Sequence, residues 1–257
     1  MVVSAMKTRG MLPMRFERTK LLLGEEAMKK IRDSHVTVCG LGGVGSHAVE
    51  SLCRAGVGHL TLVDCDVASE SNLNRQLFAL ESTLGAPKTE AARRRVVDIN
   101  PSCDLTLMNC LIDETTNPVI LSRRTDVLID AIDSLSAKVH LIANAHEAKI
   151  HVVSSMGAGG RIDANAITTG DIAETHTCPL ARFVRIRLHR RNIYSGVRCV
   201  FSTEKPIMKK LSMDQAALSD QSDIKKTPII GSISYLPAIF GFKAAFEALL
   251  HIIGQRS

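Results

Sequence analysis

A glycine-rich turn is the first feature of the sequence with the composition of a ligand site. The stretch Gly40-Leu-Gly-Gly-Val-Gly45 follows a short apolar run and precedes a segment with helical spacing. Glycines at 40, 42 and 45 fit the G-x-G-x-x-G pattern, and Gly43 is an additional glycine. Such a turn lets backbone N–H groups at a helix N-terminus approach phosphates. Asp64 follows Gly45 by 19 residues, where an acid can hydrogen-bond a ribose hydroxyl. We expect a nucleotide site here; the alternative is a tight strand–helix turn without a ligand.

The polar segments after Asp64 narrow the choice of nucleotide. They contain Asp66, the run Ser71-Asn72-Leu73-Asn74-Arg75-Gln76, and Pro87-Lys88. Arg75 and Lys88 would neutralise phosphate charge, and the amides of Asn72 and Gln76 would donate hydrogen bonds to oxygens. A nicotinamide dinucleotide has no need of this group, so the pattern predicts a nucleoside triphosphate. Each residue taken singly would be an ordinary solvated loop residue, and only their grouping indicates function.

Two acidic residues end a later apolar run, in the sequence Asp130-Ala-Ile-Asp133-Ser134. Mg²⁺ is a hard cation that binds carboxylates and keeps several waters. The two acids therefore predict a Mg²⁺ site that bridges the phosphates, with Asp133 as the metal ligand. The alternative is that Asp130 or Asp133 caps the helix predicted to begin near Leu135.

Alternating strand and helix signals must position these groups. Apolar, β-rich runs predict strands at 35–39, 59–64, 104–108, 126–132, 150–154 and 197–202, and helical spacing predicts helices at 21–31, 46–55, 87–99, 135–148, 182–191 and from 235 onward. This rhythm predicts an α/β fold with a Rossmann-like, doubly wound and mostly parallel sheet, with a C-terminal extension packed on it. We expect a single domain over 1–257, with a nucleotide-binding core at 15–160, an extension at 161–257 that faces the substrate, and a mobile polar loop at 203–227.

Composition limits the class of protein and its partners. The 257 residues are 45% hydrophobic, which excludes disordered, collagen-like and small disulfide-rich chains. The net charge of +6 favours an anionic partner such as a nucleotide or RNA. With no Trp and 4% aromatic residues, a base-stacking RNA module is disfavoured.

Cysteine usage and apolar tracts indicate the compartment. None of the seven cysteines forms a C-x-x-C pair, so we expect reduced thiols, no structural zinc and a cytoplasmic location. Residues 1–15 are basic and Met-rich and lack the apolar region of a signal peptide, so we interpret them as a lead-in; the alternative is a weak targeting stretch. The tract from Tyr235 to Ile253 is interrupted by Lys243, Glu247 and His251. It therefore predicts a buried helix and no membrane partner.

In combination, these motifs resemble the adenylation domain shared by ubiquitin-activating enzymes and their ThiF/MoeB relatives in thiamine and molybdopterin biosynthesis. The resemblance covers about residues 15 to 160. It implies ATP with Mg²⁺, adenylation of a carboxylate, and catalysis by Arg75, Lys88 and Asp133. Arg15-Phe-Glu-Arg18 matches an N-terminal arginine motif, which implies a homodimer in which Arg18 of the partner subunit reaches the ATP site. The residues that the resemblance and the patterns assign to ATP are Gly40, Gly42, Gly43, Gly45, Asp64, Asp66, Ser71, Asn72, Asn74, Arg75, Gln76, Lys88, Asp133 and Ser134.

Later segments favour one branch of this family. Carrier-activating members usually have two C-x-x-C pairs, which this chain lacks. Its residues 157–163 (GAGGRID), 179–181 (PLA), 200–206 (VFSTEKP) and 231–232 (GS) resemble the tRNA threonylcarbamoyladenosine dehydratases instead. That resemblance implies activation of the threonine carboxylate beside the anticodon and cyclisation with loss of water. It also implies a sulfur-transfer or cysteine-desulfurase partner. Some members have a cysteine near the last helix, where this chain has none, so Cys178 is the remaining thiol candidate, against an ordinary loop cysteine.

Basic residues in the extension are candidates for contacts with tRNA. The run from 182 to 191 holds five arginines. On a helix, Val184 and Leu188 would face inward and most arginines outward toward phosphates; the alternative is a solvated helix face. The arginines are Arg182, Arg185, Arg187, Arg190 and Arg191, and the polar loop adds Lys205, Lys209, Lys210, Lys225 and Lys226.

Three further functions remain open from the sequence alone. The first is adenylation of the C-terminal carboxylate of a ubiquitin-like or sulfur-carrier protein. The second is nicotinamide-dependent oxidoreduction, which the group around Arg75 disfavours. The third is a nucleotide-binding scaffold without catalysis.

Overall fold

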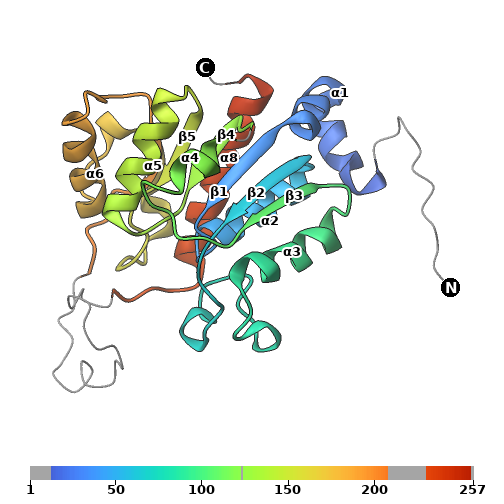
Figure 1. Cartoon of the computed structure of the whole chain (residues 1–257), viewed down its shortest axis with the longest axis horizontal. Coiled ribbons are helices and arrows are strands. Elements are labelled where there is room, and N and C mark those ends of the chain that lie inside the picture. The colour runs from blue at the N-terminus through green and yellow to red at the C-terminus, as the bar shows by residue number, and fades with distance from the viewer. Residues whose placement is uncertain (1–12, 123, 208–229, 256–257) are drawn as a thin grey trace.

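A seven-stranded sheet forms the frame of the protein (Figure 1). The computed structural model describes residues 13–122, 124–207 and 230–255. The strand order is β3-β2-β1-β4-β5-β7-β6, and all neighbours are parallel except β6, which is antiparallel to β7. The predicted mostly parallel α/β fold is confirmed. The strands are β1 (His35–Cys39), β2 (His59–Val63), β3 (Asp104–Met108), β4 (Val127–Asp130), β5 (His151–Ser155), β6 (Ile167–Asp171) and β7 (Arg198–Ser202).

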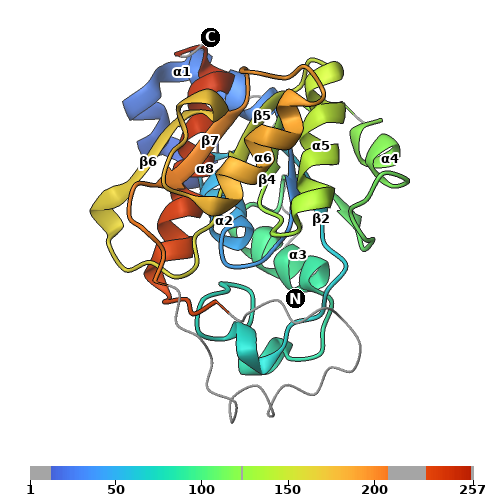
Figure 2. The same ribbon diagram turned by 90° about the vertical axis from the view of Figure 1, so that its left-hand side faces the viewer.

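Helices cover both faces of the sheet because successive strand residues point to opposite sides. In β4, Val127 and Ile129 enter one core, whereas Leu128 enters the other. The first core is closed by α1 (Glu17–Asp33), α2 (Gly45–Ala55), α3 (Lys88–Ile99) and α8 (Tyr235–Ile253). The second is closed by α4 (Asn117–Leu121), α5 (Leu135–Glu147) and α6 (Pro179–His189). Figure 2 shows α5 and α6 side by side on their face of the sheet.

The last helix belongs to the core of the fold. By length and composition α8 could cross a membrane, but it packs against α2, β4, β5 and β7. Leu236, Phe240 and Ala244 are fully buried there. Glu247, also buried, pairs with Arg198 of β7 at 2.9 Å. The expectation of a buried helix is therefore confirmed for this tract.

Element boundaries depart from the sequence expectations in a few places. Helix α1 begins at Glu17 and α6 at Pro179, both earlier than predicted, and Pro87 is the N-cap of α3 and not its first-turn residue. Neither β6 nor α4 was expected, because each has five residues and no clear periodicity. Most of the polar loop expected at 203–227, with Lys209, Lys210, Lys225 and Lys226, lies outside the described residues, as do residues 1–12.

Candidate active site

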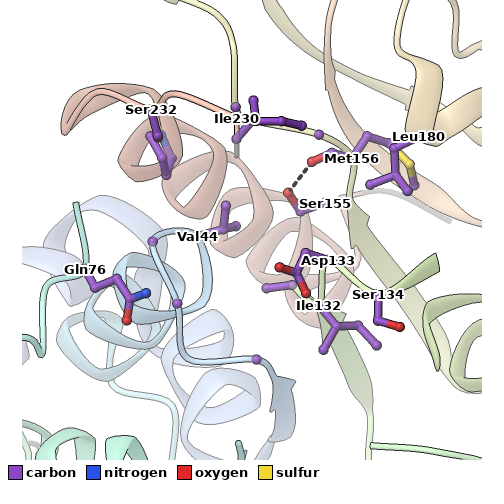
Figure 3. A pocket seen from close by; sticks show the side chains of 18 of the residues that line it. Val44, Gln76, Ile132, Asp133, Ser134, Ser155, Met156, Leu180, Ile230 and Ser232 are labelled. Atoms are coloured by element: carbon purple, nitrogen blue, oxygen red, sulfur yellow. Dashed lines mark hydrogen bonds between the residues drawn. The ribbon is translucent and has the colours of Figure 1, made fainter. Parts of the chain in front are cut away.

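A cavity of about 740 Å³ opens at the carboxyl ends of the central strands. Its walls come from the turns that follow β1, β2, β4 and β5. Strands β2 and β4 lie on opposite sides of β1, so this is the switch point at which doubly wound sheets bind ligands. Figure 3 shows Gln76 on one side of the cavity and Met156 with Leu180 on the other.

The glycine turn has the shape that only glycines permit. Gly40 has a φ of 87°, and a Cβ on it would lie 2.8 Å from the carbonyl oxygen of Ala131. A Cβ on Gly45 would lie 1.8 Å from the Gly40 oxygen, and one on Gly43 would lie 2.9 Å from Cβ of Pro237. The N-cap of α2 is Val44, with no side-chain cap. The Ser46 N–H of α2 donates to the Gly42 carbonyl oxygen at 3.0 Å. The backbone that a ligand can approach is therefore that of Gly42, Gly43 and Val44, which line the cavity before α2.

Asp64 fixes the glycine turn to the end of β2. Its buried carboxylate accepts hydrogen bonds from the backbone N–H of Leu41 at 2.6 Å and of Asp66 at 2.8 Å. Lys88 is also buried, and its Nζ donates to Asp66 Oδ2 at 2.7 Å and lies 4.0 Å from Asp64 Oδ1. The two acids hold the Lys88 ammonium in the cavity wall. Carboxylate oxygens have further lone pairs, so these bonds leave acceptors for a ribose hydroxyl.

Arg75 is held in place by its own loop. Its Nη1 donates to the Ser71 carbonyl oxygen and to Asn74 Oδ1, both at 2.8 Å. The Asn74 amide in turn donates to the Ser232 carbonyl oxygen at 3.3 Å. Arg75, Asn72 and Gln76 line the cavity, but Ser71 and Asn74 do not. Of the expected ATP residues, Ser71, Asn74 and Gly45 therefore shape the site from outside its wall.

The two acids at the end of β4 have different surroundings. Asp133 and Ser134 are exposed and line the cavity. Asp130 is fully buried and accepts hydrogen bonds from Lys138 Nζ and Ser154 Oγ, both at 2.6 Å. Asp130 is thus not available to a metal, which corrects the expectation of two metal-binding acids. The N-cap of α5 is Ser134, without a side-chain cap bond, so neither acid caps that helix.

Cysteines contribute to the cavity wall, but two of them are held as thiols. Cys65 and Cys110 line the cavity, and burial, with nearby Asp66 and Asp113 respectively, raises the pKa of each thiol. Cys178 also lines the cavity and is 3% exposed, at the N-cap of α6. It lies beside Gly157 at the Met156–Leu180 wall.

Two polar residues of the cavity were not singled out as site residues by the sequence. Arg161 is buried and lines the cavity, and its Nη2 has no hydrogen-bond partner among the described residues. The hydroxyl of Ser232 is likewise buried and unpartnered within the described ranges. Both lie in segments, 157–163 and 231–232, whose sequence indicates a family resemblance but no role for a particular residue. Local sequence gives no signal for them because their position depends on contacts with distant segments.

The arginine-rich run lies mainly on helix α6. Val184 and Leu188 are buried, as expected. Arg185 is half-buried, and its Nη1 donates to the carbonyl and hydroxyl oxygens of Thr175 at 2.6 and 2.7 Å. Arg185 therefore has a structural contact, which corrects the expectation that it projects freely outward. The exposed basic residues are Arg182, Arg187, Arg190 and Arg191, together with Lys205.

The N-terminal arginine motif lies away from the cavity. Arg18 is exposed at the start of α1 and does not line the cavity. Helix α1 leads into the amino end of β1, whereas the cavity lies beyond the carboxyl ends. Exposed apolar side chains accompany Arg18, namely Met14, Leu21 and Leu22.

Similarity to known proteins assigns this fold and cavity to a family. The model of the ThiF family matches residues 16–257. The chain belongs to the ThiF family. Among ThiF relatives, it is 37% identical over 227 residues to the tRNA threonylcarbamoyladenosine dehydratase of Bacillus subtilis strain 168, covering 88% of this chain and 89% of that protein.

Structural similarity agrees with this ThiF assignment. The crystal structure of Escherichia coli tRNA N6-threonylcarbamoyladenosine dehydratase in complex with ATP matches with a TM-score of 0.82 and 35% identity, over 94% of each chain. The molybdopterin-synthase adenylyltransferase of Escherichia coli strain K12 is 39% identical, but over only 54% of each chain. The dehydratase likeness therefore includes the extension after residue 160, as the sequence motifs predicted.

Proposed function

We propose that this ThiF-family protein uses ATP to dehydrate N6-threonylcarbamoyladenosine next to the tRNA anticodon, through an acyl adenylate of the threonine carboxylate. The observation that carries this proposal is the dehydratase likeness over nearly the whole chain. The cavity supports it, because the wall at Met156 and Leu180 extends beyond the residues of the nucleotide motifs. That wall leaves a place for a second substrate beside ATP.

In the proposed first step, an oxygen of the substrate carboxylate bonds to the α-phosphorus of ATP. The bond from that phosphorus to the bridging oxygen breaks, and pyrophosphate leaves with the electron pair. The backbone N–H groups of the glycine turn, together with Arg75 and Lys88, would stabilise the charge that develops on the phosphate oxygens. Lys88 is preorganised for this role because Asp66 and Asp64 fix its ammonium.

Asp133 can supply a ligand for a divalent cation at the phosphates. Asp133 is exposed in the cavity, and its carboxylate accepts no hydrogen bond from the described residues, so its oxygens are available. Bound Mg²⁺ would neutralise pyrophosphate charge there. We therefore assign Asp133 as the ligand of Mg²⁺ and Ser134 as its neighbour at the phosphates.

The proposed second step needs no enzyme nucleophile. A nitrogen of the substrate's own threonylcarbamoyl chain attacks the activated carbonyl carbon and loses its proton to solvent. The bond from that carbon to the AMP oxygen breaks, AMP leaves with the electron pair, and the ring closes. Attack within one molecule has a high effective concentration once the reactants are held together. The whole reaction thus removes the elements of one water from the nucleoside.

Mass spectrometry of the tRNA nucleoside tests this function. Protein, ATP and Mg²⁺ should convert threonylcarbamoyl-modified tRNA to a nucleoside lighter by one water, with AMP as co-product. Lys88→Ala and Asp133→Ala should abolish conversion without unfolding, whereas the matched surface variants Lys149→Ala and Asp98→Ala should retain it. An unchanged nucleoside after ATP is consumed would contradict the proposal. Pyrophosphate exchange that requires a carrier protein and not tRNA would support the carrier-activating alternative.

We further propose a homodimer in which Arg18 of the partner subunit completes each cavity. The exposure of Arg18 and of Met14, Leu21 and Leu22 around it supports this arrangement. Complementation tests it: Arg18→Ala and Lys88→Ala should each be inactive alone. Mixing them should restore about a quarter of wild-type activity, because half of the random dimers contain one intact site. No recovery on mixing would show that Arg18 acts within its own chain or not at all.

We propose that the exposed arginines of α6 contact tRNA phosphates. Replacing Arg182 and Arg187 by Gln should weaken tRNA binding and reduce its salt dependence by roughly one unit of slope per lost phosphate contact. ATP binding should be unchanged. An unchanged salt slope would indicate a solvated helix face.

Chain organisation and location complete the proposal. Strands β6 and β7 of the extension join the same sheet as the core. We therefore propose that 1–257 acts as one domain, with the 15–160 core binding ATP and 161–257 facing the tRNA. A tRNA-modifying, ATP-using protein with seven free cysteines among its described residues fits the reducing cytoplasm.

A further inference from the structure

Arg161 is a buried arginine with part of its guanidinium left without hydrogen-bond acceptors. Its side chain is 3% exposed, and it lines the cavity. A guanidinium carries five N–H donors. Nε donates to the Glu204 carbonyl oxygen, and Nη1 donates to the carbonyl oxygens of Gly157 and Gly159. The two N–H groups of Nη2 have no partner among the described residues.

The charge of Arg161 is also uncompensated. All three of its acceptors are neutral backbone carbonyls, and it forms no ion pair with an acid of the described ranges. Two acids lie near Arg161 in the chain or by contact, and both carboxylates accept backbone N–H groups instead: Glu204 from Ile162 and Asp163, and Asp163 from Asn165. A buried cation without a counter-charge is costly, as is a buried donor without an acceptor. An anionic ligand in the cavity would remove both costs.

The position of Arg161 distinguishes this ligand from the phosphates of the nucleotide. The phosphate groups are assigned to the glycine turn, Arg75 and Lys88. Gln76, on the opposite side of the cavity from Met156 and Leu180 (Figure 3), lies beside Gly42 of this turn, and Arg75 lies beside Gly43. Arg161 is bonded to Gly157, which follows Met156 on the other side and lies beside Cys178 and Leu180. In the function proposed above, on which this inference rests, the second substrate carries a carboxylate.

We propose that Arg161 is the carboxylate-recognition residue of this enzyme, with Nη2 donating to the substrate carboxylate oxygen that does not attack ATP. The three carbonyl contacts hold the guanidinium plane fixed, so the donor is preorganised. A fixed donor on one oxygen leaves the other oxygen directed away from Arg161 for the attack on the α-phosphorus. Arg161 also selects for charge, because a neutral group in this place leaves the guanidinium uncompensated.

Binding of two matched tRNAs tests this role. The first carries threonylcarbamoyladenosine, and the second carries the same group with its carboxylate converted to a carboxamide. In the absence of ATP, wild-type protein should bind the carboxylate form about 10-fold or more tightly, as expected for a hydrogen bond to a charged group. Arg161→Gln should lose most of this preference, and Arg161→Lys should keep part of it. The surface variant Arg94→Gln should behave as wild type.

Separate outcomes distinguish this inference from the proposed function. If the wild-type protein binds the carboxylate and carboxamide tRNAs equally, this result alone overturns the role of Arg161. An Arg161→Gln protein that keeps the full preference overturns it as well, and one that loses ATP affinity instead assigns Arg161 to the phosphates. Failure of wild-type protein to remove water from the nucleoside overturns the function itself, whatever the binding preference.

Discussion

Replacing Lys138 by Met should destabilise the protein strongly. Lys138 Nζ donates to Asp130 Oδ2 at 2.6 Å, to the Ser155 carbonyl oxygen at 3.0 Å and to Ser154 Oγ at 3.3 Å. The side chains of Lys138 and Asp130 have no exposed surface. Methionine fills a similar volume, so the main consequence is a buried Asp130 carboxylate that keeps only Ser154 and the backbone N–H of Ile132 as donors.

The size of the effect follows from this loss of compensation. Breaking a buried ion pair by removing one partner costs about 3–5 kcal/mol. For a chain of this size each kcal/mol lowers Tm by about 2–4 °C, so Tm should fall by roughly 6–20 °C. The double variant Asp130→Asn, Lys138→Met removes both charges and should be more stable than Lys138→Met alone.

Urea unfolding followed by circular dichroism measures these free energies. The single variants Lys138→Met and Asp130→Asn, the double variant and the wild type form a double-mutant cycle, from which the coupling between the side chains is obtained. A loss below about 1 kcal/mol in Lys138→Met, the size expected for a surface pair, would refute the reasoning. A double variant less stable than Lys138→Met would refute it too.

Three further changes have outcomes that the structure specifies. His151 and His251 stack with ring centroids 3.7 Å apart, and burial, followed by the neighbouring His251, lowers the pKa of His151 to about 4. In the unfolded chain the pKa of His151 is about 6.5, so on acidification the unfolded state takes up a proton before the folded state. The free energy of unfolding should therefore fall as pH drops from about 6.5 to 4. His151→Phe should flatten this part of the stability curve. Gly45→Ala should unfold the protein, because the new Cβ would lie 1.8 Å from the Gly40 carbonyl oxygen. Gly42→Ala should keep the wild-type Tm, because the atom nearest to its new Cβ, Gln76 Nε2, is 3.7 Å away. Cys178→Ala should still convert the tRNA, because neither proposed step needs a thiol.

Different readouts check these three predictions. Urea unfolding at several pH values tests His151, and an equally steep loss of stability in His151→Phe would contradict its assignment. Thermal melts compare the glycine variants, and equal Tm values would show that the turn can rearrange. Nucleoside mass tests Cys178, and a variant that binds ATP but fails to convert tRNA would indicate a covalent role.

The sequence predicted the parts of the fold whose signals are local. Strands β1 and β2 are short β-rich runs with apolar residues at alternating positions, and the glycine turn has a fixed spacing. The strands, and the place of the turn after β1, therefore followed from local sequence. Strand β6 was missed because its five residues include Thr168, Thr169 and Gly170, and its strand conformation depends on pairing with β7.

The site was predictable only where chemistry and local spacing coincide. Arg75, Lys88 and Asp133 lie in motifs, and the structure brings them to one cavity. The separate fates of Asp130 and Asp133 were not predictable, because only the packing of α5 onto β4 brings Lys138 to one of them. A lysine within the apolar stretch of α5 was the available signal for this pair.

The contact between Gly43 and Pro237 links the order of synthesis to ligand binding. The glycine turn is made early in translation, but the wall that faces it belongs to α8, at the end of the described chain. A nascent chain whose strands β1 to β6 have left the ribosome still lacks α8, which forms this wall and covers the first core. Complete nucleotide binding would therefore report that the chain has been made through α8.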